Sequence, residues 1–517
     1  MRAILYIYLT HLLGSEGLVG DAAKDAATHT YHLFAAGVYA LPIVGAIIAD
    51  RLLGKYHTIL WLSIVYCLGH VCLAVFEDDI SGFRMGLVLI AVGSGGIKPC
   101  VSAHVGDQFG KGNWHLIERV YQAFYFIINF GSFFATLAIP WVKEAYGPAW
   151  AFGIPGILMA IATFFFWMGR HVFVHVPPRP GGKLGLIDTI SGTLLFFSIG
   201  SLMFFGAFSE SYAELSWALK GLISVGFLAA GLTVFAFRQS LAVDDGFLSV
   251  LFYAFKVKVT GREDEPLPSA IATEGAPDST AAVTDHWLFG PAVRRFGAEI
   301  AEGPWAVLKI TTVFLMVSVF WALFDQHGSS WVRQATDMDR TLEIFGSTIT
   351  VLPSQVQAAN PLLVMMLVPL FGLWGYGAVE KLTRVTMTPL RRMTLGMFVA
   401  STSFVVVALI QERLDAGVSV HIAWQLVAYL LITAAEVMVS VTGLEFAYTQ
   451  APRRMKSTIM GFWLLCISLG NELVALLAGF QGLPLATFFW IFAGLMALAA
   501  VLFGARASFY TYQDYSQ

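Results

Sequence analysis

The chain has very little charge for its length. Charged residues make up 13% of its 517 residues, against roughly 25% in soluble globular domains. Hydrophobic residues make up 57% and aromatic residues 14%. A soluble protein needs far more charged surface, and a disordered chain, a collagen or a coiled coil has a different composition. The composition is therefore that of a membrane protein with many spans.

Cysteine is also scarce, and neither sign of charge prevails. The four cysteines, Cys67, Cys72, Cys100 and Cys466, lie in apolar stretches without metal-ligand spacing, where a thiol acts as a small hydrophobe. The net charge is −3, so there is no basic arm for nucleic acid. The sequence shows no nucleophile–base set and no cofactor loop. We therefore expect neither an enzyme nor a protein with a metal or an organic cofactor.

Thirteen apolar stretches are long enough to cross a bilayer as helices, which takes about 20 residues. They cover residues 29–49, 57–76, 83–103, 119–141, 149–169, 184–207, 216–237, 305–325, 360–378, 389–411, 420–445, 456–480 and 484–506. A fourteenth, residues 1–14, rises about 21 Å as a helix, which is less than the hydrocarbon core of about 30 Å. It is either a true short helix inside the bundle or a span whose first turns are missing.

A polar stretch divides these spans into two sets. Residues 260–285 predict a flexible linker, and residues 287–300 predict an amphipathic helix on the membrane surface, with Val293, Phe296 and Ile300 on its apolar side. We therefore expect four parts. They are an N-terminal six-helix bundle at 1–170, an extra two-helix hairpin at 184–237, a linker at 238–304 and a C-terminal six-helix bundle at 305–507. Two similar halves around a midplane site are typical of secondary transporters.

Positive charge is concentrated in alternate loops, which predicts the orientation. One set of loops carries Arg51, Lys55, Lys111, Arg119, Arg170, Arg179, Lys183, Lys381, Arg384, Arg391, Arg392, Arg453, Arg454 and Lys456. The opposite set carries only Lys24, Arg84, Lys143, Arg333, Arg340 and Arg413. The first set should face the cytoplasm, and both termini with it.

Several ionisable residues fall inside the predicted spans, where a charge costs about 2.5–3.5 kcal/mol on insertion scales. Arg2 and Lys98 are cations of the first half, and Asp325 and Glu436 are anions of the second. Opposite charges from two halves can pair and then separate when a ligand or proton arrives. His32 titrates near neutral pH, so it is either a proton site or a packed, hydrogen-bonded histidine.

Other polar and aromatic residues of the spans have two interpretations each. Asn129 and Asn360 carry amides that both donate and accept, which suits a peptide backbone as ligand or a contact between helices. Tyr39, Trp321 and Trp463 suit a pocket wall or ordinary packing. The glycines around Ser94 in GSGG, at 93–96, predict close helix packing and a bend.

Longer motifs carry a family resemblance. GAIIADRLLGKYHT, at 45–58, resembles the loop signature of the major facilitator superfamily, through Gly45, Asp50, Arg51, Gly54 and Lys55. GSGGIKPCVSAHVGDQFG, FYFIINFGS, FWALFDQHGSSWVRQA and EFAYTQAPRRMKSTIMGFWLLCISLGN resemble the proton-dependent oligopeptide transporters. The resemblance implies an all-α membrane protein with a major facilitator fold of fourteen spans. It also implies import of di- and tripeptides with protons, across the inner membrane if the chain is bacterial.

The resemblance also implies roles for particular residues. Arg2 and Lys98 would bind the carboxylate of the peptide, and Glu436 would bind its amino group. Asn129 and Asn360 would hold the peptide backbone. The pocket wall would consist of Tyr39, Trp321 and Trp463. The residues that would take part in proton coupling are His32, Asp325, Glu436 and Lys98. Asp325 would be the acidic partner of Arg2.

One departure keeps other functions open. The family's first helix carries a Glu-x-x-Glu-Arg signature just before the segment that MRAILYIYLT resembles, and this chain begins after it. The alternatives are a same-fold transporter of another small solute, or a non-transporting paralogue that acts as a receptor. Glu436 favours peptides, because a carrier of anions gains nothing from a central carboxylate.

Overall fold

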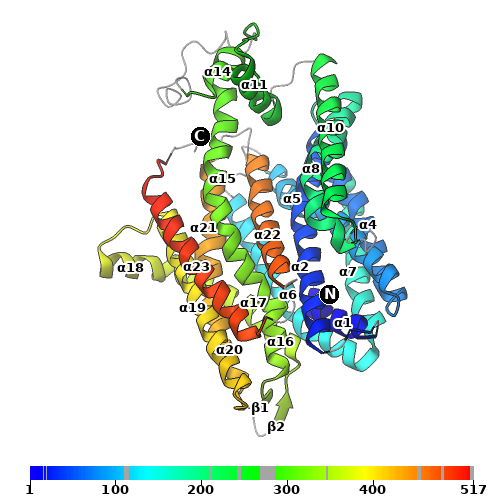
Figure 1. The fold of residues 1–517 in the computed structure, drawn as a ribbon, viewed down its shortest axis with the longest axis vertical. Coiled ribbons are helices and arrows are strands. Elements are labelled where there is room, and N and C mark those ends of the chain that lie inside the picture. Colours follow the sequence, from blue (N-terminus) through cyan, green and yellow to red (C-terminus); the bar gives the residue numbers. More distant parts are fainter. Residues whose placement is uncertain are drawn as a thin grey trace.

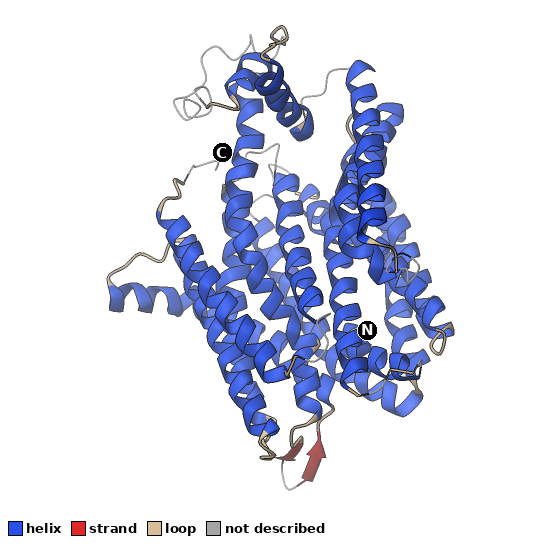
Figure 2. Cartoon of the chain, in the orientation of Figure 1, coloured by secondary structure: helices blue, strands red, loops and turns tan. Residues whose placement is uncertain are grey.

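The structure is a computed structural model that describes residues 1–15, 17–18, 20–109, 116–208, 212, 214–241, 246–267, 286–344, 347–450, 456–478 and 483–512. The described chain is overwhelmingly helical (Figure 2). Most helices run along the long axis of one bundle, with a small β-hairpin at one end and α11 and α14 at the other (Figure 1). Following the orientation that the loop charges predict, we call these the outer end and the inner end.

The helices of the N-terminal half and its hairpin follow one another along the chain. They are α1 (Arg2–Ser15), α2 (Asp21–Ala40), α3 (Pro42–Ile48), the π-helix η1 (Ala49–Leu53), α4 (Lys55–Val75), α5 (Ile80–Asp107), α6 (Ile117–Tyr146), α7 (Pro148–Met168), the 3-10 turn η3 (Gly169–His171), α8 (Gly182–Phe208) and α10 (Trp217–Leu241). Local chemistry sets several bounds. The Asp79 side chain caps α5 by accepting from the Gly82 N–H at 2.8 Å. Gly147, at φ 90°, and Pro148 separate α6 from α7.

The remaining elements form the linker and the C-terminal half. They are α11 (Phe247–Thr260), α14 (Gly290–Phe296), α15 (Ala298–Phe324), η5 (Asp325–Gly328), α16 (Ser330–Thr336), β1 (Thr341–Ile344), β2 (Ser347–Thr350), η6 (Pro353–Ala358), α17 (Ala359–Leu370), the π-helix η7 (Phe371–Gly375), α18 (Tyr376–Thr383), α19 (Pro389–Asp415), α20 (Ala423–Glu436), the π-helix η8 (Val437–Val441), α21 (Thr442–Thr449), α22 (Lys456–Ala478) and α23 (Leu485–Ser508). The largest apolar core lies among α15, α19, α20, α22 and α23.

Twelve helices of the described chain are long and apolar enough to cross a membrane. They include each predicted span except residues 1–14 and 360–378. The first forms α1, which has 14 residues. The second runs from α17 through η7 into α18, which projects sideways from the bundle (Figure 1). The all-helical membrane fold is therefore confirmed, whereas the count of fourteen spans and the four domain bounds stay predictions.

Two local predictions differ from the structure. Strands β1 and β2 pair antiparallel, with Thr341 opposite Thr350, where the sequence analysis had only a loop. The amphipathic helix predicted at 287–300 ends at Phe296, because Gly297 takes φ 90° and α15 begins after it. Its apolar residue Phe296 is buried against α11 instead of facing lipid. Most of the predicted linker at 260–285 lies outside the described residues.

The close packing predicted for the glycine-rich segment is confirmed. A Cβ on Gly45 of α3 would lie 2.2 Å from the carbonyl oxygen of Gly95 in α5, and one on Gly96 would lie 1.9 Å from Leu62. Real Cβ atoms do not approach so closely, so only glycine lets these helices meet. Pro99 follows within the same helix and leaves one i−4 carbonyl without its helical donor. This packing sets the position of Lys98 relative to α3 and α4.

Candidate functional site

Arg2 and Asp325 form an ion pair between the two halves, as predicted. Nη2 of Arg2 lies 3.0 Å from Oδ1 of Asp325, whose side chain is 2% exposed. Asp325 opens η5, the tight turn that ends α15. Nη1 of Arg2 also donates to the Tyr39 hydroxyl at 3.4 Å, and its guanidinium lies over the ring of Tyr31. Arg2 therefore joins α1 and α2 of the first half to the second half inside the bundle.

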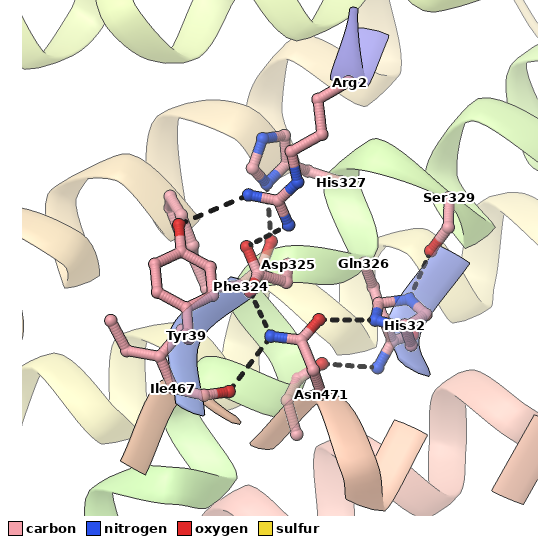
Figure 3. A network of polar contacts seen from close by, with 11 residues as sticks. Arg2, His32, Tyr39, Phe324, Asp325, Gln326, His327, Ser329, Ile467 and Asn471 are labelled. Carbon is pink, nitrogen blue, oxygen red and sulfur yellow. Dashed lines mark hydrogen bonds and ion pairs between the residues drawn. The ribbon is translucent and has the colours of Figure 1, made fainter. Parts of the chain in front are cut away.

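His32 forms a second link between the halves, through an amide that the sequence analysis did not single out. Nδ1 of His32 lies 2.8 Å from Oδ1 of Asn471, and Nε2 lies 2.6 Å from the Ser329 hydroxyl. The Asn471 amide nitrogen donates to Asp325 and to the Ile467 carbonyl. This network assigns the proton of the neutral ring to Nδ1, with Ser329 donating to Nε2. Figure 3 shows the relay from Arg2 through Asp325 and Asn471 to His32.

Lys98 and Tyr39 lie beside this relay and are less buried than its members His32 and Asp325. Nζ of Lys98 lies 3.6 Å from the centroid of the Tyr39 ring, a cation–π distance. Lys98 is exposed and Tyr39 and Arg2 are half-buried, although all three sit within the helices of the bundle. His32 and Asp325, by contrast, are buried. The structure thus separates an accessible set of cationic and aromatic groups from a buried pair of titratable groups.

Glu436 and Asn360 form a polar contact within the C-terminal half. The Asn360 amide donates to Oε2 of Glu436 at 2.8 Å and to the Thr433 hydroxyl at 3.1 Å. Both Glu436 and Asn360 are half-buried. Glu436 is the last residue of α20 and is followed at once by the π-helix η8, a distortion that is frequent at functional sites. An accessible carboxylate of the second half therefore complements the accessible cations of the first.

The predicted pocket residues Trp321, Trp463 and Asn129 are placed differently. Trp321 and Trp463 are 6% and 2% exposed, and their rings pack edge-to-face with centroids 6.1 Å apart. A Cβ on Gly443 would lie 2.2 Å from the Trp463 ring. Both tryptophans are part of the apolar core of the C-terminal half. Asn129 is half-buried on α6, and the contacts above do not include it.

The loop motif at 45–55 braces the inner end of the first half. Gly54 takes φ 78° at the end of η1, a conformation that favours glycine. Lys55 Nζ lies 2.8 Å from Oδ2 of Asp107 at the end of α5. The Asp50 carbonyl accepts from the Arg179 N–H at 2.9 Å, and Arg51 reaches Asp188 of the extra hairpin at 3.5 Å. The motif therefore ties the start of α4 to α5, and η1 to α8.

A third link between the halves lies at the outer end and was also missed. Arg333 of α16 pairs with Asp25 at 2.6 Å and with Asp21 at 3.1 Å, both on α2. From the sequence, Arg333 is predicted only as a charge in a loop. Ser468 adds a hydrogen bond to the Ala36 carbonyl at 2.8 Å. These contacts hold α2 against α16 and α22, so the structure has its outer side closed.

For the proton-coupled transport that the family resemblance implies, we expect His32→Gln to reduce the dependence of uptake on pH. Glutamine keeps a polar side chain between Asn471 and Ser329 but cannot take up a proton, whereas histidine can. Uptake driven by a proton gradient should therefore fall about tenfold, which corresponds to about 1.4 kcal/mol. Initial uptake rates measured between pH 5 and 8 test this. His29→Gln, on the same helix, is the matched control, and an unchanged profile in His32→Gln would contradict the assignment.

We expect Arg333→Gln to loosen the outer side without harming the site. The pair with Asp25 is partly exposed, so its loss should shift the conformational balance by roughly 0.2–1 kcal/mol, up to about fivefold. A cysteine placed at Thr28, which is 4% exposed, should then react several times faster with a membrane-impermeant maleimide. Arg340→Gln is the control, because Arg340 bonds the Val351 carbonyl within its own half. Equal labelling rates in both variants would count against an outer gate here.

Comparison with known proteins assigns the fold. The sequence model of the POT family matches residues 56–229 and 298–491. The crystal structure of an auto-inhibited POT family peptide transporter is 34% identical, with a TM-score of 0.75, and the match covers 100% of this chain and 95% of that one. The crystal structure of a proton-dependent oligopeptide (POT) family transporter is 36% identical, with a TM-score of 0.67 and coverages of 97% and 96%.

Curated animal relatives match over most of this chain but only part of their own. Solute carrier family 15 member 2 of Rattus norvegicus is 28% identical over 86% of this chain and 50% of that protein. Peptide transporter family 1 of Drosophila melanogaster is 30% identical, over 80% and 45%. The chain thus spans about half the length of these relatives. From the family match, the full-length structural likeness and the placement of the motif residues, we conclude that the chain belongs to the POT family, with the fold of the major facilitator superfamily.

Proposed function

We propose that the chain is a proton-coupled symporter that imports di- and tripeptides by alternating access. The observation that carries this proposal is the placement of accessible opposite charges on the two halves. Lys98 and Arg2 lie on the first half, and Glu436, bonded to Asn360, lies on the second. The names of two relatives, Peptide transporter 3 of Caenorhabditis elegans and Peptide transporter family 1 of Drosophila melanogaster, support it.

A zwitterionic peptide matches this arrangement at three points. Its carboxylate would bind Lys98 and Arg2, and its ammonium group would bind Glu436, through charge-assisted hydrogen bonds. The Asn360 amide can turn from Glu436 to the peptide backbone, since an amide donates and accepts. Because these groups recognise features common to all short peptides, side-chain selectivity should be broad. A peptide that touches both halves also favours their closure around it.

Protons supply the driving force in this proposal, and no other cofactor is needed. Protonating Asp325 removes the charge that attracts Arg2, and protonating His32 turns Nε2 from an acceptor into a donor facing Ser329. The first change weakens a contact between the halves in the outer-closed structure, and the second reverses the direction of the hydrogen bond with Ser329, whose hydroxyl can also accept. Protonation of Asp325 therefore favours the outer-open arrangement over the outer-closed one. We place the protein in the plasma membrane, the inner membrane in a bacterium, with the inner end in the cytoplasm.

Dialanine uptake in proteoliposomes tests the proposal. We expect accumulation with an inward proton gradient and little without it. An N-acetylated, amidated dialanine, which lacks both charged ends, should compete poorly. Accumulation of another solute in place of peptide would favour a same-fold transporter of that solute. Peptide binding without accumulation, in folded protein, would overturn the transport proposal and favour a receptor.

A further inference from the structure

Helix α11 lies outside the membrane-spanning helices and contacts the end of the extra hairpin. The amide of Gln239, in α10, donates to the Ser249 hydroxyl of α11 at 2.7 Å. The rings of Phe235 and Phe252 pack with centroids 5.0 Å apart. We call the region of these two side-chain contacts the α10–α11 junction.

On its other side, α11 is embedded in the C-terminal half. Its buried residues form one apolar cluster with α14 and the start of α15, which comprises Val250, Tyr253, Ala254, Val257, Leu288, Phe289, Ala292, Phe296, Ile300 and Ala301. Tyr253 packs edge-to-face on Phe296 with centroids 5.5 Å apart. Phe247 also meets Phe462 of α22 at 6.1 Å. The helix is thus attached to the C-terminal half by a small core of its own.

Charged contacts extend this attachment beyond α11. Glu263 pairs with Arg294, whose guanidinium lowers the pKa of that carboxyl. Asp264 pairs with Arg295 at 2.5 Å and with Lys256 at 2.9 Å. The Leu267 N–H donates to the Arg295 carbonyl at 2.9 Å. We call residues 247–267 and 290–296 together the strap. The strap moves with α15.

The extra hairpin is attached just as firmly to the N-terminal half. Arg238, 3% exposed, places Nε 2.8 Å from Oδ1 of Asp188, whose other oxygen faces Arg51 of the loop motif. A Cβ on Gly185 would lie 1.8 Å from the Arg51 carbonyl oxygen, so α8 rests directly on η1. A buried charge pair of this kind strongly resists separation, because parting it leaves a charge unpaired. The hairpin therefore moves with the first half.

The α10–α11 junction is thus a small contact between two firmly attached bodies. We propose that this junction is a latch: it stabilises the outer-closed arrangement seen here and opens each time the two halves rock. The inference rests on the proposed alternating access. A rocking motion concentrates its displacement where contact is weakest. Within the residues that the structure describes, the neutral hydrogen bond and the ring pair named above are each weaker than the apolar cluster or the buried ion pair.

A disulfide-type cross-link across the junction tests whether it must open. Gln239→Cys and Ser249→Cys would be combined in a background in which Cys67, Cys72, Cys100 and Cys466 are replaced and dialanine uptake is retained. Cross-linking with a short bifunctional thiosulfonate should lower gradient-driven uptake at least about tenfold, with recovery on reduction. Dialanine affinity should stay unchanged. Full uptake by the cross-linked protein would overturn the latch.

The matched control is a pair inside the hairpin, Ser198→Cys with Ser224→Cys. The Ser224 hydroxyl donates to the Ser198 carbonyl, so this cross-link joins α8 to α10 within one body. It should leave uptake unchanged. If it also arrests uptake, the loss reflects general rigidity and the latch assignment is overturned.

A second measurement does not depend on peptide uptake. Spin labels at Leu241 and Val259, which are 50% and 84% exposed, report the distance across the junction. We expect two distance populations whose ratio shifts toward the longer one, roughly tenfold, in Phe235→Ala. A single distribution, unchanged in the variant, would overturn the latch. If the parent protein shows two populations but takes up no peptide, the proposed function fails while the latch stands.

Discussion

Asp325→Asn should abolish most gradient-driven uptake while leaving peptide exchange largely intact. Asparagine keeps the shape of the side chain and can still accept from Arg2, but it carries no charge and cannot release a proton. Breaking a buried charge pair costs about 3–5 kcal/mol. Because Arg2 is 36% exposed, we expect breaking this pair to cost less, about 2–3 kcal/mol. That cost corresponds to a fall in gradient-driven uptake of roughly 30- to 150-fold. Uptake with a proton gradient and counterflow without one should be measured on the same vesicles.

The matched control for this variant is Asp337→Asn. Asp337 follows α16, and its carboxylate accepts from the Thr336 hydroxyl at 3.3 Å, away from the buried relay. Its gradient-driven uptake should be unchanged. If Asp325→Asn kept both gradient-driven uptake and its pH dependence, then Asp325 would be only a structural partner of Arg2.

Glu436→Gln should weaken recognition of the peptide amino group more than any other single change. A hydrogen bond to a charged group contributes about 1.5–3 kcal/mol, so the KM for dialanine should rise roughly 10- to 150-fold. The replacement amide still fits beside Asn360 and Thr433, so the fold should survive. N-acetyl-alanyl-alanine, which has no ammonium group to lose, should be affected less than about threefold. Competition of both peptides against labelled dialanine provides the measurement.

Glu445→Gln serves as the matched control, because Glu445 lies in α21, beyond the π-helix that follows Glu436. Its KM for dialanine should match that of the parent. An equal loss for free and N-acetylated peptides in Glu436→Gln would show that the carboxylate shapes the site and does not bind the amino group.

Hydropathy predicted the twelve helices of the described chain that are long and apolar enough to cross a membrane, because each one repeats the same signal over about 20 residues. The ends of the helices and the breaks between them were less predictable. The inner-end helix stops at Phe296 because Gly297 adopts a left-handed conformation, and no periodic pattern reports the conformation of a single glycine. The strand pair at 341–350 is too short to give a clear alternating signal.

The charged centres Arg2, Lys98, Asp325 and Glu436 were predictable because a charge within a span is rarely incidental. Their partners were harder to find. Asn471 satisfies the same rule that singled out Asn129 and Asn360, an amide inside an apolar span, and could have been selected with them. Ser329 gives no comparable signal, since serine is frequent both in helices and in loops.

Tryptophans Trp321 and Trp463 show the limit of residue type as a guide to position. Their large rings suit a pocket wall and a packed core equally well. The structure buries both in the apolar core of the C-terminal half, with the Trp463 ring also edge-to-face on Phe314 at 5.0 Å. Only the three-dimensional neighbours decide between the two roles.

The enclosure of His32 has a kinetic consequence. Its ring is 0% exposed, and both of its nitrogens are occupied, one by Asn471 and the other by Ser329. Water therefore cannot exchange a proton with the ring until one of these contacts breaks. Asn471 and Ser329 both belong to the opposite half, so proton exchange must wait for the halves to part. Such an enclosed site suppresses passive leakage of protons, because the ring cannot open to both sides of the membrane in one state.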